Sequence, residues 1–193
     1  YHRLAVSKEE REKSYYLDSA KIYYEKLEIL PALNIEMESL IARAYVNLSA
    51  IYEKDSMYDK AESYVRKSII IHKKYKNNLS SAVALNNLGN IFLSQKEYKK
   101  SKEIYLEAIA LIEKSDDPKA IRIKSSLYFN LAWAMRNLDD FEAYDIQELS
   151  YKIEGDIREK EFSGIIERVT QEYNFDAQKE LFQEQEEVKR LRD

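Results

Sequence analysis

An internal repeat constrains the fold of this chain more than any other feature. Residues 45–52 read Tyr-Val-Asn-Leu-Ser-Ala-Ile-Tyr, and 40 positions later residues 85–92 read Leu-Asn-Asn-Leu-Gly-Asn-Ile-Phe. A third copy begins another 43 positions on, at residues 128–135. Self-similarity with a period of about 20–50 residues indicates supersecondary units that stack and bury one continuous core.

Each unit is predicted to form two amphipathic helices joined by a short turn. In residues 85–92 the large or small nonpolar residues occur at i, i+3, i+4 and i+7, which is one stripe of an α-helix. On the partner helix, Tyr98, Ser101, Tyr105 and Ala108 also form one helical stripe. Gly89 and Ser101 are small where two helix backbones would cross closely. The turns within the pairs are expected at 54–56, 95–97 and 138–140.

Composition supports an all-α fold. The 193 residues include three glycines, two prolines and no cysteine, so a sheet-rich fold with many tight turns is disfavoured and a disulfide scaffold is excluded. Pro31 and Pro118 fall in links between units, where a helix has to end or begin. The predicted helices cover 14–29, 34–53, 57–76, 79–95, 98–114, 118–137, 141–160 and a last segment from about 163.

This pattern resembles the tetratricopeptide repeat (TPR) family. The family signature is large-x-x-Leu-Gly/Ala-x-x-Tyr, then an aromatic residue, then Ala-x-x-x-aromatic-x-x-Ala. Residues 45–68 and 85–108 match almost the whole signature, and residues 128–141 match its first helix and turn. The resemblance implies a right-handed α-α superhelix, a TPR solenoid of antiparallel helix pairs, followed by a long C-terminal helix.

The predicted domain organisation follows from the repeat positions. A TPR-like helical repeat domain is expected at 1–160, and a charged C-terminal helix or coiled-coil connector at 161–193. The repeat domain would contain a half repeat at about 14–30 and full repeats at about 37–76, 79–115 and 120–160.

Two features depart from the family pattern. The period is about 40 rather than about 34 residues, so the units look like the long ones of kinesin light chains and of bacterial peptide-sensing regulators. The small residue expected after the third turn is missing, because Tyr144 stands where Ala61 and Ser101 stand in the earlier units. The last helix pair is therefore expected to pack differently.

The resemblance also implies a binding groove. In this family the first helix of each unit lines a concave wall that binds a protein or an extended peptide. Position 46 is Val and position 86 is Asn, so the Lys-plus-Asn clamp of chaperone-binding members is absent and a C-terminal carboxylate is disfavoured as ligand. Carried over by position, the groove residues are Arg43, Asn47, Asn86, Asn87, Asn90, Phe129, Asn130, Trp133 and Arg136.

Asn47, Asn87 and Asn130 occupy the same position in the three units. A side-chain amide carries donors and an acceptor, so it can pair with the backbone of a bound peptide whatever the peptide's sequence, as it does in the family. The alternative is that these amides cap or bridge neighbouring helices.

Phe129 and Trp133 stand at i and i+4 and would face the groove as aromatic anchors for a partner. The alternative for this pair is that the final helix folds back and covers the two rings.

No catalytic or metal site is predicted, no cofactor is expected, and the chain is interpreted as non-enzymatic. His72 lies at the polar end of a helix, beside Lys73, with no second His or Cys near it, so metal binding and acid–base catalysis are disfavoured. The net charge of −4 and the lack of basic clustering argue against nucleic-acid binding by the repeats. No run approaches about 18 apolar residues, so no membrane span is expected.

The C-terminal segment is rich in charge and suggests how the chain works. Its sparse apolar residues lose their heptad spacing at Asp176, which predicts a long exposed helix or a weak coiled coil. The chain starts on Tyr1 and ends without a helix stop signal, so a fragment of a longer protein is expected. The favoured function is the peptide-binding sensory or regulatory part of a bacterial signalling or transcription-regulating protein. The alternative is a structural assembly module that forms a homodimer through residues 163–193.

Overall fold

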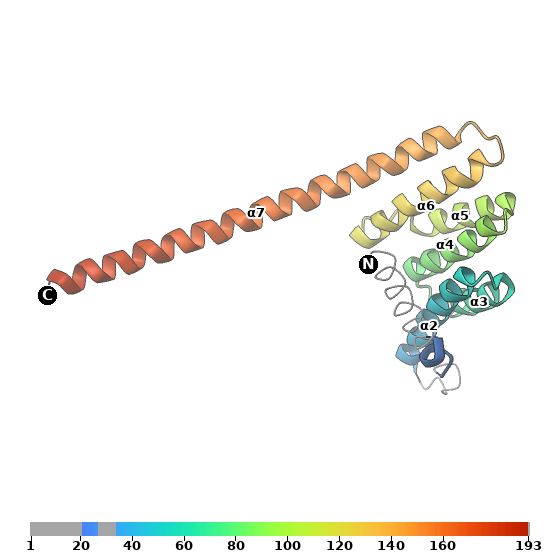
Figure 1. Ribbon diagram of the computed structural model, residues 1–193, viewed down its shortest axis with the longest axis horizontal. Helices are drawn as coiled ribbons and strands as arrows, with labels where there is room; N and C mark the ends of the chain where they lie inside the picture. Colours follow the sequence, from blue (N-terminus) through green and yellow to red (C-terminus); the bar gives the residue numbers. More distant parts are fainter. Residues whose placement is uncertain (1–20, 27–33, 193) are drawn as a thin grey trace, which may run out of the picture. The chain divides into compact units, whose positions relative to one another are not determined.

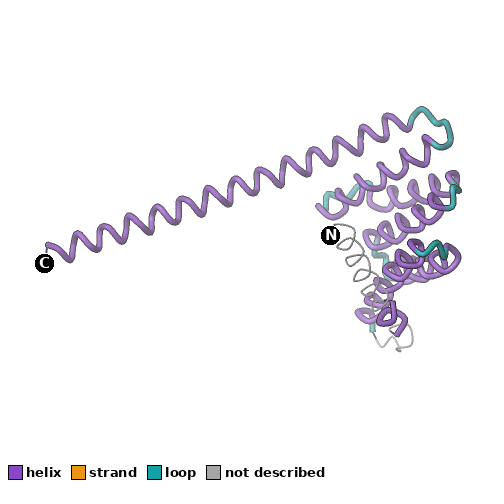
Figure 2. Tube along the Cα trace, viewed as in Figure 1, coloured by secondary structure: helices purple, strands orange, loops and turns teal. Residues whose placement is uncertain are grey.

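The computed structural model describes residues 21–26 and 34–192, and this part of the chain is helical, with no strand (Figures 1 and 2). The all-α prediction is confirmed. The predicted half repeat at about 14–30 lies mostly outside the described residues. The helices are a short segment at 21–26, α2 (Ile35–Lys54), α3 (Tyr58–Lys74), α4 (Asn78–Ser94), α5 (Tyr98–Ile112), α6 (Pro118–Arg136) and α7 (Ala143–Arg192).

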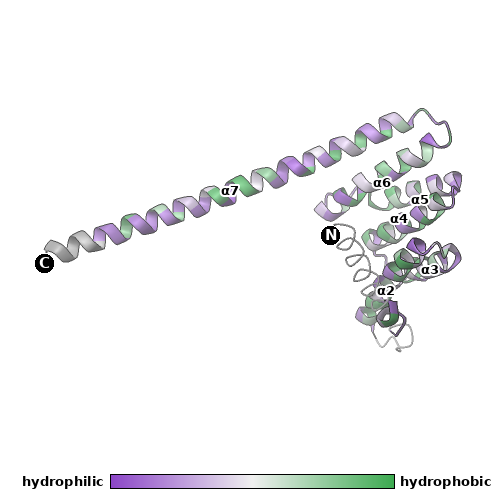
Figure 3. Cartoon of the chain, in the orientation of Figure 1, coloured by the Kyte–Doolittle hydropathy of each residue, from purple (hydrophilic) through white to green (hydrophobic). Residues whose placement is uncertain are grey.

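Helix α7 differs from the two helices that the sequence predicts at 141–160 and from about 163. It is continuous over 50 residues. No proline interrupts it, and Gly155 and Gly164 stand in it with open space where a Cβ would lie, so nothing in its sequence forces an end. The chain divides into two compact units, residues 1–151 and 152–193. In the second unit apolar and polar residues alternate irregularly along the helix (Figure 3).

The helices of the first unit pack in chain order, and the first helices of successive pairs also meet. Helices α2 and α3 form one pair and α4 and α5 the next, while α3 packs on α4 and α5 on α6. In addition, α2 contacts α4, and α4 contacts α6. The first turns of α7 join α6 through reciprocal hydrogen bonds, from Ser125 Oγ to the Ser150 carbonyl (3.2 Å) and from Ser150 Oγ to the Ser125 carbonyl (2.9 Å). This arrangement is that of a helical-repeat solenoid.

Gly89 allows helix α5 to pack closely on α4. A Cβ at this position would lie 2.8 Å from Cδ1 and Cζ of Tyr105, whose ring is completely buried against α4. Beside it, Ser101 Oγ donates a hydrogen bond to the Gly89 carbonyl oxygen (3.0 Å). The φ angle of Gly89 is not positive, so its backbone conformation does not require glycine. Glycine is required here because a side chain would have no space.

The preceding unit fills the same crossing with a different pair. Ser49 takes the position of Gly89, and Val65 takes that of Tyr105; both are completely buried. The smaller valine leaves room for the serine side chain, whereas the larger tyrosine leaves room for none. The total side-chain volume at the crossing is thus shared differently in the two units.

The turns within pairs reuse one backbone motif without glycine. Ser56, Lys96 and Asp139 occupy equivalent positions and have φ angles of 59°, 61° and 57°. In each turn the next residue's N–H reaches the carbonyl five residues back, as in Glu97 N–H to Phe92 O (2.8 Å). This is the Schellman arrangement, in which a left-handed residue ends a helix. It confirms turns at 54–56, 95–97 and 138–140.

The third turn corrects the prediction for Tyr144. Ala143 is completely buried at the small-residue position, whereas the side chain of Tyr144 is 65% exposed. The cause is a tightened helix start, because the Ala143 N–H bonds to the Asp140 carbonyl three residues back (3.1 Å). In the preceding unit Ser101 N–H bonds four residues back. A change of one residue turns the helix by about 100°, which brings alanine to the core.

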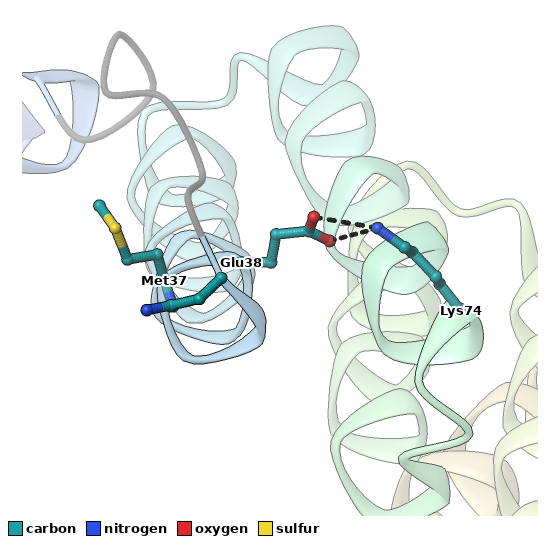
Figure 4. A network of polar contacts seen from close by, with 4 residues as sticks. Met37, Glu38 and Lys74 are labelled. Atoms are coloured by element: carbon teal, nitrogen blue, oxygen red, sulfur yellow. Dashed lines mark hydrogen bonds and ion pairs between the residues drawn. The ribbon is translucent and has the colours of Figure 1, made fainter.

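An ion pair between helices closes one end of the first pair. Lys74 Nζ near the end of α3 contacts both carboxylate oxygens of Glu38 in the first turn of α2, at 2.8 and 2.9 Å (Figure 4). The hydrogen bond from Lys74 lowers the pKa of Glu38. The pair is partly open to solvent, so its contribution to stability is small. No helix in the described part of the chain is long and apolar enough to cross a membrane.

The Gly89–Tyr105 contact predicts a strong effect of Gly89→Ala. The added methyl group would overlap the buried ring, and overpacking of this kind costs about 1–3 kcal/mol of unfolding free energy. In the double variant with Tyr105→Val, which reproduces the volumes of the preceding unit, the alanine should cost at least about 1 kcal/mol less. Urea denaturation of the four chains measures this coupling.

Gly155→Ala is the matched control for this substitution. Gly155 is also helical, but nothing lies within 4 Å of an added Cβ, so alanine there should not destabilise the chain. Additive effects of Gly89→Ala and Tyr105→Val would show that the ring does not require the glycine.

Candidate interaction face on the first helices

The exposed side chains of α2, α4 and α6 form one surface, which we call the first-helix face. Equivalent repeat positions and the contacts of α4 with α2 and α6 place these residues on neighbouring helices. Arg43 and Asn47 are exposed on α2. On α6, Phe129 and Trp133 are 42% and 48% exposed. Such large exposed aromatic residues on a solenoid surface are typical of an interaction site.

Three of the predicted asparagines form a hydrogen-bonded network between α4 and α6. Asn130 Nδ2 donates to Asn86 Oδ1 (3.1 Å) and to Asn90 Oδ1 (3.2 Å). Asn90 Oδ1 also accepts the hydroxyl of Tyr105 (2.6 Å). These amides therefore bridge helices, in agreement with the structural alternative for Asn130. The Nδ2 groups of Asn86 and Asn90 keep donors for a ligand.

The side chains of the other two asparagines form fewer hydrogen bonds. Asn47 Nδ2 donates to the hydroxyl of Tyr24 (3.0 Å) in the helical segment 21–26. Asn87 is half-buried, and its side chain forms no hydrogen bond to another described residue. Among the five predicted asparagines, Asn87 is thus the one with its whole amide available, and peptide binding by it remains a prediction.

Trp133 carries a cation on its face. The guanidinium carbon of Arg136 lies 5.0 Å from the centre of the indole ring, which is a cation–π contact. Asn137 Nδ2 donates to the Trp133 carbonyl (2.8 Å), which fixes the last turn of α6. The predicted residues Trp133 and Arg136 therefore act as one flat, positively charged surface.

A hollow of about 290 Å³ opens at the α2 end of the first-helix face. It is lined by residues of three helices: Arg43, Val46, Asn47, His72, Ser80 and Val83. His72 lies in the basic last turn of α3, as expected, but its side chain is buried and only 4% exposed. Burial lowers its pKa, so the imidazole is neutral at pH 7.

Two of these lining residues are polar where the next unit is apolar. At the offsets of the repeat, 40 residues from α3 to α5 and 43 from α4 to α6, Ile112 corresponds to His72 and Ile123 to Ser80; Ile112 is buried in the core, and Ile123 is partly buried against it. Sequence reasoning considered His72 only for metal binding and catalysis and did not consider Ser80, so it missed both as lining residues of the hollow. Their register within the repeat is the signal that could have found them.

A half-buried carboxyl group stands at the boundary between α2 and α4. Glu53 Oε1 accepts a hydrogen bond from Ser94 Oγ (2.9 Å). Burial raises the pKa of Glu53, partly offset by this hydrogen bond. Within the described residues, no group of three or more His, Cys, Asp or Glu side chains is placed to hold a metal ion.

Comparison with known proteins agrees with this geometry. Residues 40–114 match the tetratricopeptide repeat family. The crystal structure of BtubC (BKLC) from P. vanneervenii is similar, with a TM-score of 0.66 and 19% sequence identity over 74% of this chain and 58% of that chain. At this identity the likeness concerns the fold alone. The aligned part thus spans less than two thirds of that protein, and no curated protein matches the sequence.

The buried neutral imidazole predicts a distinct pH dependence of stability. As the pH falls through about 6.5, the unfolded chain gains a proton at His72 before the folded chain does, so folding weakens. His72→Ile should remove this part of the pH dependence. Urea midpoints at pH 7.5 and 5.5 should therefore fall further for the natural chain than for the variant.

Other titrating groups are common to both chains, so they cancel in this comparison. Glu53, whose pKa is raised, acts in the opposite direction in both. Equal pH dependence of the two chains would show that His72 is protonated alike in the folded and unfolded states.

Proposed function

We propose that this chain is a non-enzymatic scaffold that binds an extended peptide segment of a protein partner along the first-helix face. One observation carries the proposal: exposed aromatic, amide and guanidinium groups line neighbouring first helices, while apolar residues fill the core behind them. Amides satisfy a peptide backbone, and the rings of Phe129 and Trp133 offer anchoring surfaces. The family match to residues 40–114 supports a role in protein interaction.

The wider role is the sensory or regulatory part of a larger bacterial signalling or transcription-regulating protein. Support comes from the long repeat period and from the charged helix that follows the repeats. In this proposal, peptide binding to the first-helix face is transmitted through α7. The proposal needs no cofactor, metal or nucleic acid.

Selection from a displayed library of random 12-residue peptides tests the binding. The natural chain should enrich a peptide family, and Asn87→Ala or Trp133→Ala should weaken binding of the selected peptides by about tenfold or more, because each removes a ligand contact without a core contact. Isothermal titration calorimetry gives the affinities.

Matched controls lie away from this face. Asn78→Ala changes an exposed amide at the start of α4, half a turn around the helix from Asn87, and Phe141→Ala changes an exposed ring in the α6–α7 turn. Both should bind as the natural chain does. Loss of binding in the controls, or none in Asn87→Ala and Trp133→Ala, would place the peptide elsewhere.

A second candidate function, homodimeric assembly through the C-terminal helix, is favoured by a specific surface. Phe162, Ile166, Val169 and Tyr173 follow helical spacing on α7 and are all exposed. An exposed apolar stripe on a helix is typical of a coiled-coil seam.

Light scattering at increasing protein concentration distinguishes this candidate. The natural chain should reach the mass of a dimer, and the double variant Ile166→Glu and Val169→Glu should remain a monomer, because buried unpaired carboxylates oppose the seam. Glu159→Gln and Glu161→Gln leave the apolar stripe intact and provide the control. A monomer mass for the natural chain would eliminate the candidate.

A further inference from the structure

At the hollow between α2 and α4, the first unit has polar residues where the next unit has apolar ones, so its core is less well packed there. His72 and Ser80 stand where the next unit has Ile112 and Ile123. Burying an imidazole or a hydroxyl costs free energy unless it finds a partner, so apolar residues would be the more stable choice at these positions. The structure shows no hydrogen bond from the His72 or Ser80 side chain to another described residue, which leaves their polar groups for a ligand.

The hollow carries one positive charge and an excess of donors. Arg43 contributes five N–H donors and no acceptor, and it forms no ion pair with any residue that the structure describes. Neutral His72, Ser80 and Asn47 add further donors. None of the six lining residues that the structure describes is acidic. A carboxylate is the group that this set of donors fits, because arginine binds it with two parallel hydrogen bonds.

The apolar lining indicates where the carboxylate comes from. Val46 and Val83 place branched aliphatic groups in the same hollow, which suits the methylene arm of an acidic side chain. We propose that this hollow is a specificity subsite that takes an aspartate or glutamate side chain of the bound peptide, held by Arg43, His72 and Ser80. The inference rests on the proposed function and names one feature of the peptide.

Peptide selection on the natural chain tests the subsite directly. Random 12-residue peptides are joined to the phage coat by their C-terminal ends, so they present no free terminal carboxylate. The natural chain should enrich an acidic residue at one peptide position. Arg43→Gln should lose this preference, whereas Arg66→Gln, which removes an exposed charge paired with Glu62 on α3, should keep it.

The variant His72→Ile with Ser80→Ala replaces both polar side chains of the hollow by apolar ones, as in the next unit. It should unfold at the same or a higher temperature than the natural chain and yet lose the acidic preference. A purely structural role for His72 would leave that preference unchanged. Because Ile112 and Ile123 already occupy the equivalent positions, apolar side chains there are compatible with the repeat.

A selected peptide and its Glu→Gln or Asp→Asn version complete the test by calorimetry. On the natural chain the amide version should bind about tenfold more weakly, and on Arg43→Gln the two versions should bind alike. Enrichment without an acidic position, or an acidic preference that Arg43→Gln retains, overturns the subsite while peptide binding stands. Enrichment only from a library with free C-termini assigns the carboxylate to the chain end and also overturns it. Enrichment of no peptide overturns both proposals.

Discussion

The packing of the Tyr105 ring on Gly89 is the contact on which the middle of the repeat unit depends. Because glycine has no Cβ, α5 can bring a whole aromatic ring against the backbone of α4. The ring is then long enough for its hydroxyl to pass through the core and reach Asn90. Asn90 in turn accepts from Asn130, so one helix crossing in the core positions amides of the first-helix face and links α4 to α6. Burial raises the pKa of Tyr105 further above neutral pH, so its hydroxyl is protonated and acts as the donor.

The repeat made most of the fold predictable, and the turns show where prediction failed. Residues that recur at one offset report pairs of helices and the small residues between them, so the crossing at Gly89 and the turn at Lys96 follow from sequence. The burial of Ala143 instead of Tyr144 at the small-residue position does not follow from the sequence. It depends on a hydrogen bond to the third rather than the fourth preceding residue, a local choice that no residue type in the turn specifies. Likewise, no residue within α7 marks a helix end, and the absence of such a signal is weaker evidence about a helix boundary than its presence.

The candidate site was predictable in position but only partly in chemistry. Repeat alignment located the asparagine column, yet a side-chain amide can bridge helices and bind a ligand at once, since it has two donors and an acceptor. Asn130 bridges to α4, whereas Asn87 has no described partner, and only the structure separates these two states. The sequence analysis placed His72 correctly at the end of a helix beside Lys73, but its charged neighbours gave no sign that the side chain is buried. Its repeat partner Ile112 shows that the position belongs to the core.

A solenoid can sustain such a loss of packing in one unit. Its stability is a sum of contributions from each unit and from the interfaces between neighbours, so a polar residue in one interface weakens that interface without disrupting the others. Helix pair α4–α5 is packed with Gly89, Tyr105 and Ile112, and it supports the pair before it. The first interface can therefore hold His72 and Ser80 beside an exposed Arg43. In the proposed division of roles, the unit with the better-packed core supplies the stability and the unit with the hollow supplies the specificity.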